Sequence, residues 1–507
     1  MNTTLSRLHR RAAAGLGLAA VVGMSLLSSC DKTISQPEDP TFVPTSNDVT
    51  GGTWKTYVVN ADSLIAMMAP LDSTDNNYKA ELNEIKQLQS ALTSQQMADI
   101  KYWSAGAVLR WNEVARNLVI KYNVAPVVGA APNPMKPFAH PPFASRAYAL
   151  LSVAQYDALV CSWNAKFKFG RRAPFHADAG IKQIVSVVND LPSYPSEHAA
   201  VARASAEVLK YLFPGDSAQI EEQAGVHMDT RVCAGANVRS EVRAADSLGR
   251  VVAAQIVAYA KTDNANKAGG DAAYWTNAAN FTDPTKWKSL EIPFRGGMTP
   301  EWRKVRPWNV PDIVAIRPGP PPALGSPEFN AALKQLRDIS DDRSREQWRI
   351  SDFWADGGGT STPPGHWNII AEEMIREHGQ SELRAARTLA LLNTAMMDAG
   401  INCWDAKYFY MFPRPSQMDP EIKTATGLPN FPSYTSGHST FSMSGATVLG
   451  YVFPDHKAEV EAMAAEAGIS RIYGGIHYNF DNDSGAACGN RVGQFAIARG
   501  RADGSSQ

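Results

Sequence analysis

The amino-acid sequence predicts an all-α fold, a large helical bundle or a pair of bundles with long irregular loops. Apolar residues recur at spacings of three and four along most of the chain, as in "SRAYALLSVAQYDALV" at 145–160, which is typical of helices with a buried face. Convincing strand patterns are nearly absent. With 507 residues and 44% hydrophobic content, the chain is long enough to bury a large core.

Residues 1–29 have the pattern of a secretory signal peptide, with a basic start, a short apolar run and small residues. The apolar run is too short to span a bilayer. Leu27-Ser28-Ser29-Cys30 resembles the lipobox of bacterial lipoproteins. We therefore expect a lipid on Cys30 that anchors the chain in the cell envelope, facing the periplasm or the exterior. A plain signal peptide that ends near a cysteine is the alternative.

The rest of the chain divides into a tether, an extension and a main domain. Residues 30–52 are polar and rich in Pro, Asp, Thr and Ser, which indicates a flexible tether. Residues 53–104 are expected to form a helical extension, and 105–500 the main helical domain. Helices are expected at 102–123, 143–162, 196–213, 217–228, 237–262, 329–340, 344–355, 366–378, 381–411, 437–453, 455–474 and 484–499. Residues 263–328 are typical of a long functional loop, and no repeat of a short fixed period is evident.

Charge and cysteine content narrow the function. Lys plus Arg number 49 and Asp plus Glu number 50, a balance that gives no support for nucleic-acid binding. Besides Cys30 the chain contains Cys161, Cys233, Cys403 and Cys488. These allow two disulfides in an oxidising compartment, and four buried thiols are the alternative. Because no Cys-x-x-Cys pair occurs, a cysteine zinc site is not expected.

Three clusters within 404–481 carry candidate catalytic groups. "KYFYMFPRP" contains Lys407 and Arg414, "SGHS" contains Ser436, Gly437 and His438, and "SRIYGGIHYNFD" contains Arg471, His477 and Asp481. Together they can surround a tetrahedral oxyanion with cations, a hydroxyl and a backbone N–H at a helix N-terminus. The glycine permits close approach of the backbone to a ligand. A His and an Asp at i, i+4 would share a helix face, so that the carboxylate accepts from one ring nitrogen and leaves the other free.

The order K-x6-R-P, S-G-H and S-R-x5-H-x3-D resembles the signature of the type 2 phosphatidic acid phosphatase and vanadium haloperoxidase superfamily. The resemblance implies that the oxyanion is held by Lys407, Arg414, Ser436, Gly437, Arg471 and His477. In a haloperoxidase His477 would be the nitrogen ligand to the vanadium of a vanadate cofactor; in a phosphatase it would be the nucleophile that takes phosphate from the substrate. His438 would act as general acid or base, and Asp481 would orient His477. The one departure is Thr435, where the family usually has proline.

Stretches outside these motifs favour the bacterial haloperoxidase branch. "WNEVARNLV" at 111–119, "PPFASRAYALLSVAQYDA" at 141–158, "EWRKVRPW" at 301–308 and "FWADGGGTSTPPGHWNIIA" at 353–371 resemble it. The resemblance thus covers about residues 105–500 and implies a vanadium haloperoxidase-like pair of four-helix bundles. Trp404 and Phe431 stand where aromatic residues border vanadate in fungal chloroperoxidase-like enzymes, although both could be ordinary core residues. The 33 residues from His438 to Arg471 instead resemble the compact phosphatases.

Three functions follow from these observations. The favoured one is a vanadate-dependent haloperoxidase that oxidises a halide with hydrogen peroxide, with Lys407 above all polarising the bound peroxide. The alternative is an acid phosphatase acting on a phosphate ester, either a phosphomonoester or a lipid phosphate. A non-catalytic, anion-binding surface lipoprotein is the third, although every expected group is present. His366 and Asp356 could line the site entrance or simply belong to a loop and a turn. The sequence leaves the halide, the organic substrate and the oligomeric state open.

Overall fold

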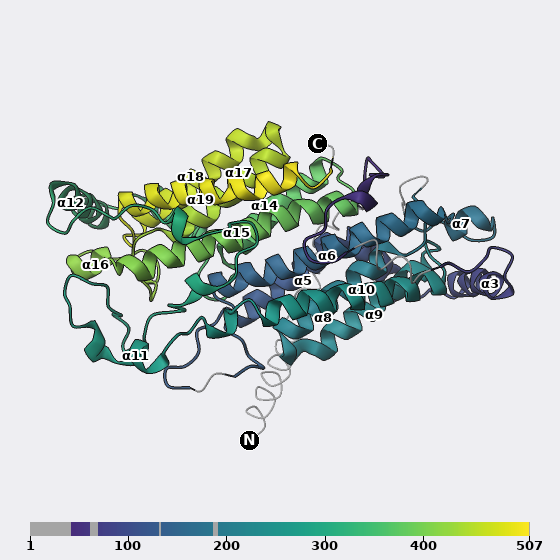
Figure 1. Ribbon diagram of the computed structural model, residues 1–507, viewed down its shortest axis with the longest axis horizontal. Coiled ribbons are helices and arrows are strands. Elements are labelled where there is room, and N and C mark those ends of the chain that lie inside the picture. The colour runs from purple at the N-terminus through teal and green to yellow at the C-terminus, as the bar shows by residue number, and fades with distance from the viewer. Residues whose placement is uncertain (1–41, 61–68, 131–132, 186–190, 506–507) are drawn as a thin grey trace, which may run out of the picture. The chain divides into compact units, whose positions relative to one another are not determined.

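The computed structural model describes residues 42–60, 69–130, 133–185 and 191–505, and all regular structure in these ranges is helical (Figure 1). This confirms the predicted all-α fold class. The longer helices are α3 (Asn76–Ser90), α4 (Ser94–Trp103), α5 (Ala107–Tyr122), α6 (Pro141–Phe169), α8 (Glu197–Leu212), α9 (Ser217–Cys233), α10 (Arg239–Lys261), α12 (Pro327–Asp341), α13 (Arg345–Phe353), α14 (Thr362–Glu377), α15 (Glu382–Tyr410), α17 (Gly437–Val452), α18 (Lys457–Tyr473) and α19 (Asn479–Arg501). Short helices are α7 (Pro174–Ala177), α11 (Ala272–Thr276) and α16 (Pro415–Met418).

The fold contains two groups of helices that pack against each other. In the N-terminal group α6 packs against α8 and α10, and α8 packs against α9. In the C-terminal group α15 packs against α17 and α19, and α17 packs against α18. The groups, blue to teal and green to yellow in Figure 1, meet along the long helices α6 and α15. The fold is therefore a pair of bundles joined through their two longest helices.

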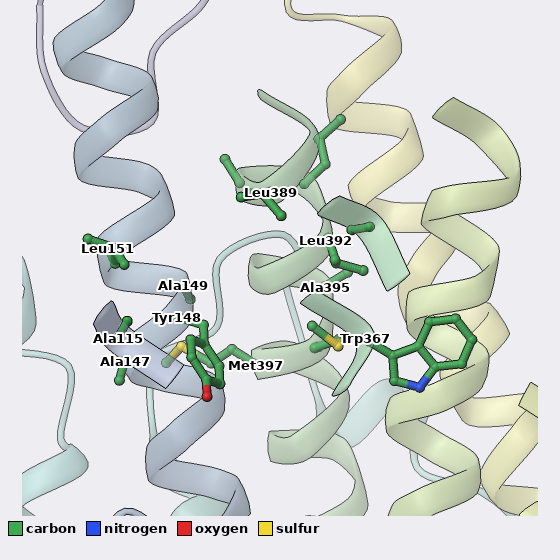
Figure 2. Close-up of a cluster of buried hydrophobic side chains, with 14 of the residues drawn as sticks. Ala115, Ala147, Tyr148, Ala149, Leu151, Trp367, Leu389, Leu392, Ala395 and Met397 are labelled. Atoms are coloured by element: carbon green, nitrogen blue, oxygen red, sulfur yellow. The ribbon is translucent and has the colours of Figure 1, made fainter. Parts of the chain in front are cut away.

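The centre of the hydrophobic core lies between α6 and α15. Figure 2 shows Tyr148 and Leu151 on α6 facing Leu392 and Met397 on α15, and all four side chains are fully buried. Almost every residue of α15 is buried, which is the expected position of a helix that is apolar on all sides. This rigid central helix carries Lys407 at its C-terminal end.

A buried carboxylate on α15 holds the long loop that follows α10. Asp398 accepts hydrogen bonds from the backbone N–H groups of Trp308, Asn309 and Val310 at 2.7, 2.7 and 3.1 Å. Trp302 of the same loop is fully buried in the main core. The predicted long loop at 263–328 is therefore an ordered segment that is fastened to the C-terminal bundle.

The N-terminal segment differs from the expected tether. Residues 1–41, including Cys30 with its expected lipid, lie outside the described residues. Residues 42–52, however, pack against the fold: Phe42 is buried, and Asp48 accepts hydrogen bonds from Arg384 Nε at 2.6 Å and from the Ser381 hydroxyl. The expectation of a flexible tether as far as residue 52 is therefore wrong, because the buried Asp48 carboxylate is paired at the start of α15.

The four cysteines of the described residues are free thiols. Cys161, Cys233, Cys403 and Cys488 are all buried, which decides between the two alternatives that the sequence leaves open. Burial raises the pKa of the Cys488 thiol to about 12, so this thiol stays protonated at neutral pH. Within the described part of the chain, no helix has both the length and the apolar character needed to cross a membrane.

The position of α15 predicts a large difference between core and surface substitutions. Leu392→Ala, at a fully buried site, should lower the free energy of unfolding by about 2–5 kcal/mol, because it removes apolar contacts and leaves a cavity. Ile369→Ala on α14, where the side chain is 42% exposed, should change it by no more than about 0.5 kcal/mol. Urea unfolding followed by circular dichroism measures both, and equal losses would contradict the central position of α15.

Candidate active site

The three sequence clusters meet where several helix ends of the C-terminal bundle come together. Because α17 packs against α15, α18 and α19, their termini bring residues from distant parts of the sequence into one site. All the predicted residues are buried except His438, which is partly exposed. Their positions are Lys407 in the last turn of α15, Arg414 before α16, Ser436, Gly437 and His438 at the start of α17, Arg471 in the last turn of α18, and His477 and Asp481 on either side of the start of α19.

A buried carboxylate orients the ring of His477. His477 Nδ1 lies 2.8 Å from Asp481 Oδ2, which also accepts from the Ser433 hydroxyl at 2.5 Å and from the Tyr478 backbone N–H at 3.2 Å. Burial raises the pKa of Asp481 to about 6, against the opposing effects of the Ser433 hydrogen bond and nearby cations. α19 begins at Asn479, not at 484 as expected, so the contact spans the start of the helix.

Arg414 determines which nitrogen of His477 carries the proton. Arg414 Nη1 lies 3.0 Å from His477 Nε2 and also donates to the Ile476 carbonyl at 2.7 Å. Since a guanidinium can only donate, Nε2 must be the unprotonated nitrogen, and Nδ1 donates to Asp481. The pKa of His477 is well below its usual value because of burial first, and then because of the charge of Arg414 and Lys407. The ring is therefore neutral, with a lone pair at Nε2.

Lys407 supports the loop that leads into α17. Its Nζ donates to the backbone carbonyls of Pro432, Ser433 and Thr435 at 2.9, 2.9 and 2.5 Å. These three bonds use all the hydrogens of the ammonium group. Burial lowers the pKa of Lys407 to about 7, and the charge of Arg414 acts in the same direction. Lys407 therefore supplies positive charge to the site while it holds the loop in place.

His438 and Arg471 form the other side of the site. Arg471 Nε donates to Ser470 Oγ at 2.8 Å, and its Nη2 donates to the Ser351 carbonyl. Burial lowers the pKa of Arg471 to about 10, although the Asp356 carboxylate nearby favours its charged form. The pKa of His438 is well below its usual value, because of burial and then because of the charge of Arg471. His438 Nε2 has no hydrogen-bond partner among the described residues.

The start of α17 adds a helix N-terminus to this cluster of cations. Ser436 is the N-cap, with its hydroxyl accepting from Ser439 N at 3.4 Å, and its own N–H donates to the Asp481 carbonyl at 2.9 Å. A side-chain Cβ at Gly437 would meet only Trp404, at 3.9 Å. The backbone at Gly437 is thus open to a small ligand, at a helix end that favours negative charge.

Two aromatic rings border the cations, as expected from the sequence. The rings of Trp404 and Phe431 lie 5.0 Å apart, and Lys407 Nζ is 5.0 Å from the centre of the Phe431 ring. The guanidinium carbon of Arg414 is 5.1 Å from the same ring. Phe431 therefore faces two of the three cations, a position in which a ring face is attracted to positive charge.

Three residues near the site were missed or left uncertain by sequence reasoning. Ser433 was not singled out, and nothing in the sequence marks it, because its role depends on a long-range contact with Asp481. His366 and Asp356 lie 3.2 Å apart at their closest atoms, and His366 stacks on Trp354 with ring centres at 4.5 Å. This His–Asp pair faces the site beside Arg471 and His438, whose pKa values both respond to it.

The loop before α12 covers the cradle. The Met298 carbonyl accepts from the Tyr408 hydroxyl at 2.7 Å and from Trp404 Nε1 at 3.3 Å, and the Asn430 amide donates to the Gly296 carbonyl at 2.9 Å. A recess of about 70 Å³ reaches Arg414 between this loop and the segment before α17. It is lined by Trp287, Lys288, Leu290, Glu291, Arg414, Leu428, Pro429 and Asn430.

Comparison with known proteins agrees with this arrangement. Residues 387–501 match the PAP2 superfamily, and a search of curated proteins gave no match. A solved bacterial vanadium-dependent iodoperoxidase is similar at 24% identity and a TM-score of 0.60, over 77% of this chain and 95% of that one. Bacterial vanadium-dependent chloroperoxidase structures, apo and holo, are similar at 14% identity, with TM-scores of 0.54 and 0.52, over 72% and 76% of this chain and 95% of each of theirs.

The range 387–501 contains all the residues of the three clusters. The structural similarity extends beyond it and takes in most of the described chain. The protein therefore has the helical fold of the bacterial vanadium-dependent haloperoxidases, and a PAP2 superfamily segment forms the bundle that contains the candidate site.

Proposed function

We propose that this protein is a vanadate-dependent haloperoxidase that oxidises a halide with hydrogen peroxide. The observation that carries the proposal is the environment of His477 Nε2, a neutral imidazole lone pair surrounded by three buried cations. The similarity to vanadium-dependent enzymes adds support, because it includes the N-terminal bundle and is not confined to the PAP2 segment.

The residues of the site suit a tetrahedral oxyanion such as vanadate. Arg414 Nη2 and His438 Nε2 are buried polar atoms for which the described residues provide no partner. Because buried polar atoms are nearly always hydrogen-bonded, these two indicate an additional ligand. The open space at Gly437 lies beside them at the start of α17. The residues therefore fit vanadate in charge, in donor positions and in space.

Each residue then has a defined role. Arg414, Arg471 and the N-terminus of α17 would hold the oxygens of vanadate, and His477 Nε2 would bind the vanadium. Bound vanadate supplies a Lewis-acid centre that activates hydrogen peroxide toward attack by a halide. Asp481 keeps the proton of His477 on Nδ1, and His438 accepts or donates a proton at Nε2. Lys407 contributes its charge, while the cover from the loop before α12 excludes water.

The location of the protein is part of the proposal and rests on the sequence alone. The pattern around Cys30 supports a lipid anchor in the cell envelope, with the helical fold facing the periplasm or the exterior. Peroxide and halide would then reach the site from outside the cytoplasm.

Phosphate-ester hydrolysis is the second candidate, and the PAP2 match favours it. His477 Nε2 would attack phosphorus and form a phosphohistidine, while His438 protonates the leaving oxygen. The two functions share every residue of the cradle, so an activity comparison has to separate them.

A paired assay tests the proposal. The chain from residue 31 onward, stripped of anions and then supplied with orthovanadate, should brominate or iodinate a dye with hydrogen peroxide, and should hydrolyse p-nitrophenyl phosphate only slowly when vanadate is omitted. His477→Ala should abolish both activities, and His456→Ala, at a histidine outside the cradle, should abolish neither. Fast hydrolysis that vanadate inhibits, with no halogenation at any pH, would establish the phosphatase instead.

The hydrogen bond between Asp481 and His477 predicts a further effect. Asp481→Asn should lower halogenation by about 10–100-fold, because the amide no longer holds the proton on Nδ1 of His477. Asp483→Asn changes an exposed carboxylate two residues further along α19 and should leave the rate unchanged. The pH profile of the Asp481 variant should also shift, which simple destabilisation would not cause.

The pKa of Lys407 predicts how anion affinity depends on pH. Since burial lowers this pKa to about 7, the free site loses a positive charge above pH 7, and an anion must then bind together with a proton. Tungstate, which keeps the same charge across this range, should bind up to about tenfold more weakly for each pH unit above 7. In Lys407→Gln the affinity should be low and nearly independent of pH. Constant tungstate affinity in the unmodified protein, measured by calorimetry, would contradict a titrating Lys407.

A further inference from the structure

The two bundles repeat the same helices in the same order. α6, α8, α9 and α10 contain 29, 16, 17 and 23 residues, and α15, α17, α18 and α19 contain the same numbers. The short helices α7 and α16, each of 4 residues, follow the first helix of each set. "SYPSEH" at 193–198 also matches "SYTSGH" at 433–438. The chain therefore contains two copies of one bundle, separated by far more residues than the short period sought in the sequence.

Buried contacts are repeated together with the helices. Arg146 Nε on α6 pairs with Asp263 at 2.6 Å, and Arg387 Nε on α15 pairs with Asp503 at 2.7 Å. Asp157 on α6 accepts three backbone N–H bonds at 2.8, 2.8 and 3.0 Å, as the carboxylate on α15 that holds the long loop does. These shared contacts allow residues of the two bundles to be matched one by one.

The matching produces a second set of cradle residues in the N-terminal bundle. Four positions keep the residue type and four change it, and every change falls on a residue that faces the proposed oxyanion or orients His477. The retained pairs are Lys166 with Lys407, Ser196 with Ser436, His198 with His438 and Arg231 with Arg471; the changed pairs are Ala173 with Arg414, Glu197 with Gly437, Asn237 with His477 and Glu241 with Asp481.

The backbone and N-cap of the second cradle are formed as in the first. The Ser193 hydroxyl donates to Glu241 at 2.7 Å, and Ser196 caps α8 by accepting from Ala199 N at 3.4 Å. Lys166 Nζ donates to the Pro192 carbonyl at 2.6 Å, which matches the bond from Lys407 to the carbonyl before Ser433. The geometry of an oxyanion cradle is therefore present in the N-terminal bundle as well.

The main difference is a carboxylate at the place where the first cradle has a glycine. Glu197 Oε2 lies 2.7 Å from Lys166 Nζ, and both side chains are buried. Burial alone would raise the pKa of Glu197, but the charges of Lys166 and Arg231 outweigh it and keep the pKa below its usual value. The two cations retained from the cradle thus face the negative charge of a side chain of the same chain.

The second cradle still has unsatisfied positive charge and some space. Arg231 is 4% exposed, and its Nε has no hydrogen-bond partner among the described residues. A cavity of about 40 Å³ lies beside it and is lined by Glu197, His198 and Glu382, among others. Burial raises the pKa of Glu382 to about 7, so at pH 6 this neighbour is mostly uncharged. Glu197 is then the main anion that balances the two cations.

The histidine of the second cradle is not free to move a proton. His198 Nδ1 lies 3.0 Å from His227 Nε2, and His227 Nδ1 accepts from Trp111 Nε1 at 3.0 Å. This chain of hydrogen bonds fixes the ring, whereas His438 Nε2 has no partner among the described residues. With Asn237 in place of the histidine nucleophile, the second cradle has no group that could bind vanadium or attack phosphorus.

We propose that the N-terminal bundle holds a second oxyanion cradle that its own Glu197 carboxylate closes, and that removal of this carboxylate converts the cradle into a binding site for a tetrahedral oxyanion. Glu197 occupies the role that the oxyanion has in the C-terminal cradle. This inference rests on the proposed function in one respect, namely that the C-terminal cradle itself binds an oxyanion.

A reciprocal exchange of the two matched residues tests the inference. Tungstate bound per chain is measured at pH 6 by equilibrium dialysis and elemental analysis. The unmodified protein should bind one tungstate, Glu197→Gly should bind two, Gly437→Glu should bind none, and the double variant should bind one. Halogenation with vanadate should be retained in Glu197→Gly, because Glu197 lies outside the catalytic bundle, and lost in Gly437→Glu.

The outcomes separate the two proposals. No tungstate on the unmodified protein would contradict the proposed function, while a single tungstate on both the unmodified protein and folded Glu197→Gly would overturn the second cradle. If Glu197→Gly unfolds, tungstate should restore its helical circular dichroism, and failure to do so also overturns the inference. Glu197→Gln keeps the size of the side chain and serves as the second variant: tungstate should raise its melting temperature more than that of the unmodified protein, and an equal rise counts against the proposal.

Discussion

Three cationic side chains lie buried in the candidate site, and the rest of the site depends on how that charge is balanced. Lys407, Arg414 and Arg471 are each at most 1% exposed, and burial of unpaired charge is costly. The nearby carboxylates are Asp481, which is bonded to His477 and Ser433, and Asp356, which is paired with His366. Backbone carbonyls take most of the remaining hydrogens, so the site is stable only in part without an added anion.

The two bundles solve the same problem in different ways. In the N-terminal copy the chain provides its own anion, and the region becomes a structural contact between α6 and α8. In the C-terminal copy a glycine stands at the matching position and leaves the charge available to a ligand. A difference of one side chain between two otherwise equal frameworks therefore separates a structural part from a chemical one, which shows how closely the function depends on local electrostatics rather than on the fold.

Much of the fold could be predicted from the sequence, because most helices bury large apolar residues at helical spacing. The start of α19 was placed five residues late, since the face that packs on α17 consists of Gly485, Gly489 and Gly493, which lie against α17 and have no apolar side chain to mark the period. The end of the tether was also misplaced, because polar residues such as Asp48 can be buried when a long-range partner is available. Neither contact is visible in a local pattern.

The residues of the site were predictable as a set, because three motifs each bring several polar groups at fixed spacing. What the sequence could not give is which hydrogen goes to which atom. Lys407 shows this: the prediction has its charge directed at the oxyanion, while the structure directs all three hydrogens to loop carbonyls. The duplication was also hidden, since the two copies share few residues and only the repeated helix lengths reveal them.

The contact between Arg414 and His477 has a consequence for kinetics. Without an anion, Arg414 Nη1 covers the Nε2 lone pair at 3.0 Å, and both groups lie beneath the loop before α12. An incoming oxyanion must break this bond before it can reach the imidazole, so loading is an exchange of partners rather than a simple encounter. The same exchange must run backward for release, and a cofactor once bound would therefore dissociate slowly and be retained on dilution.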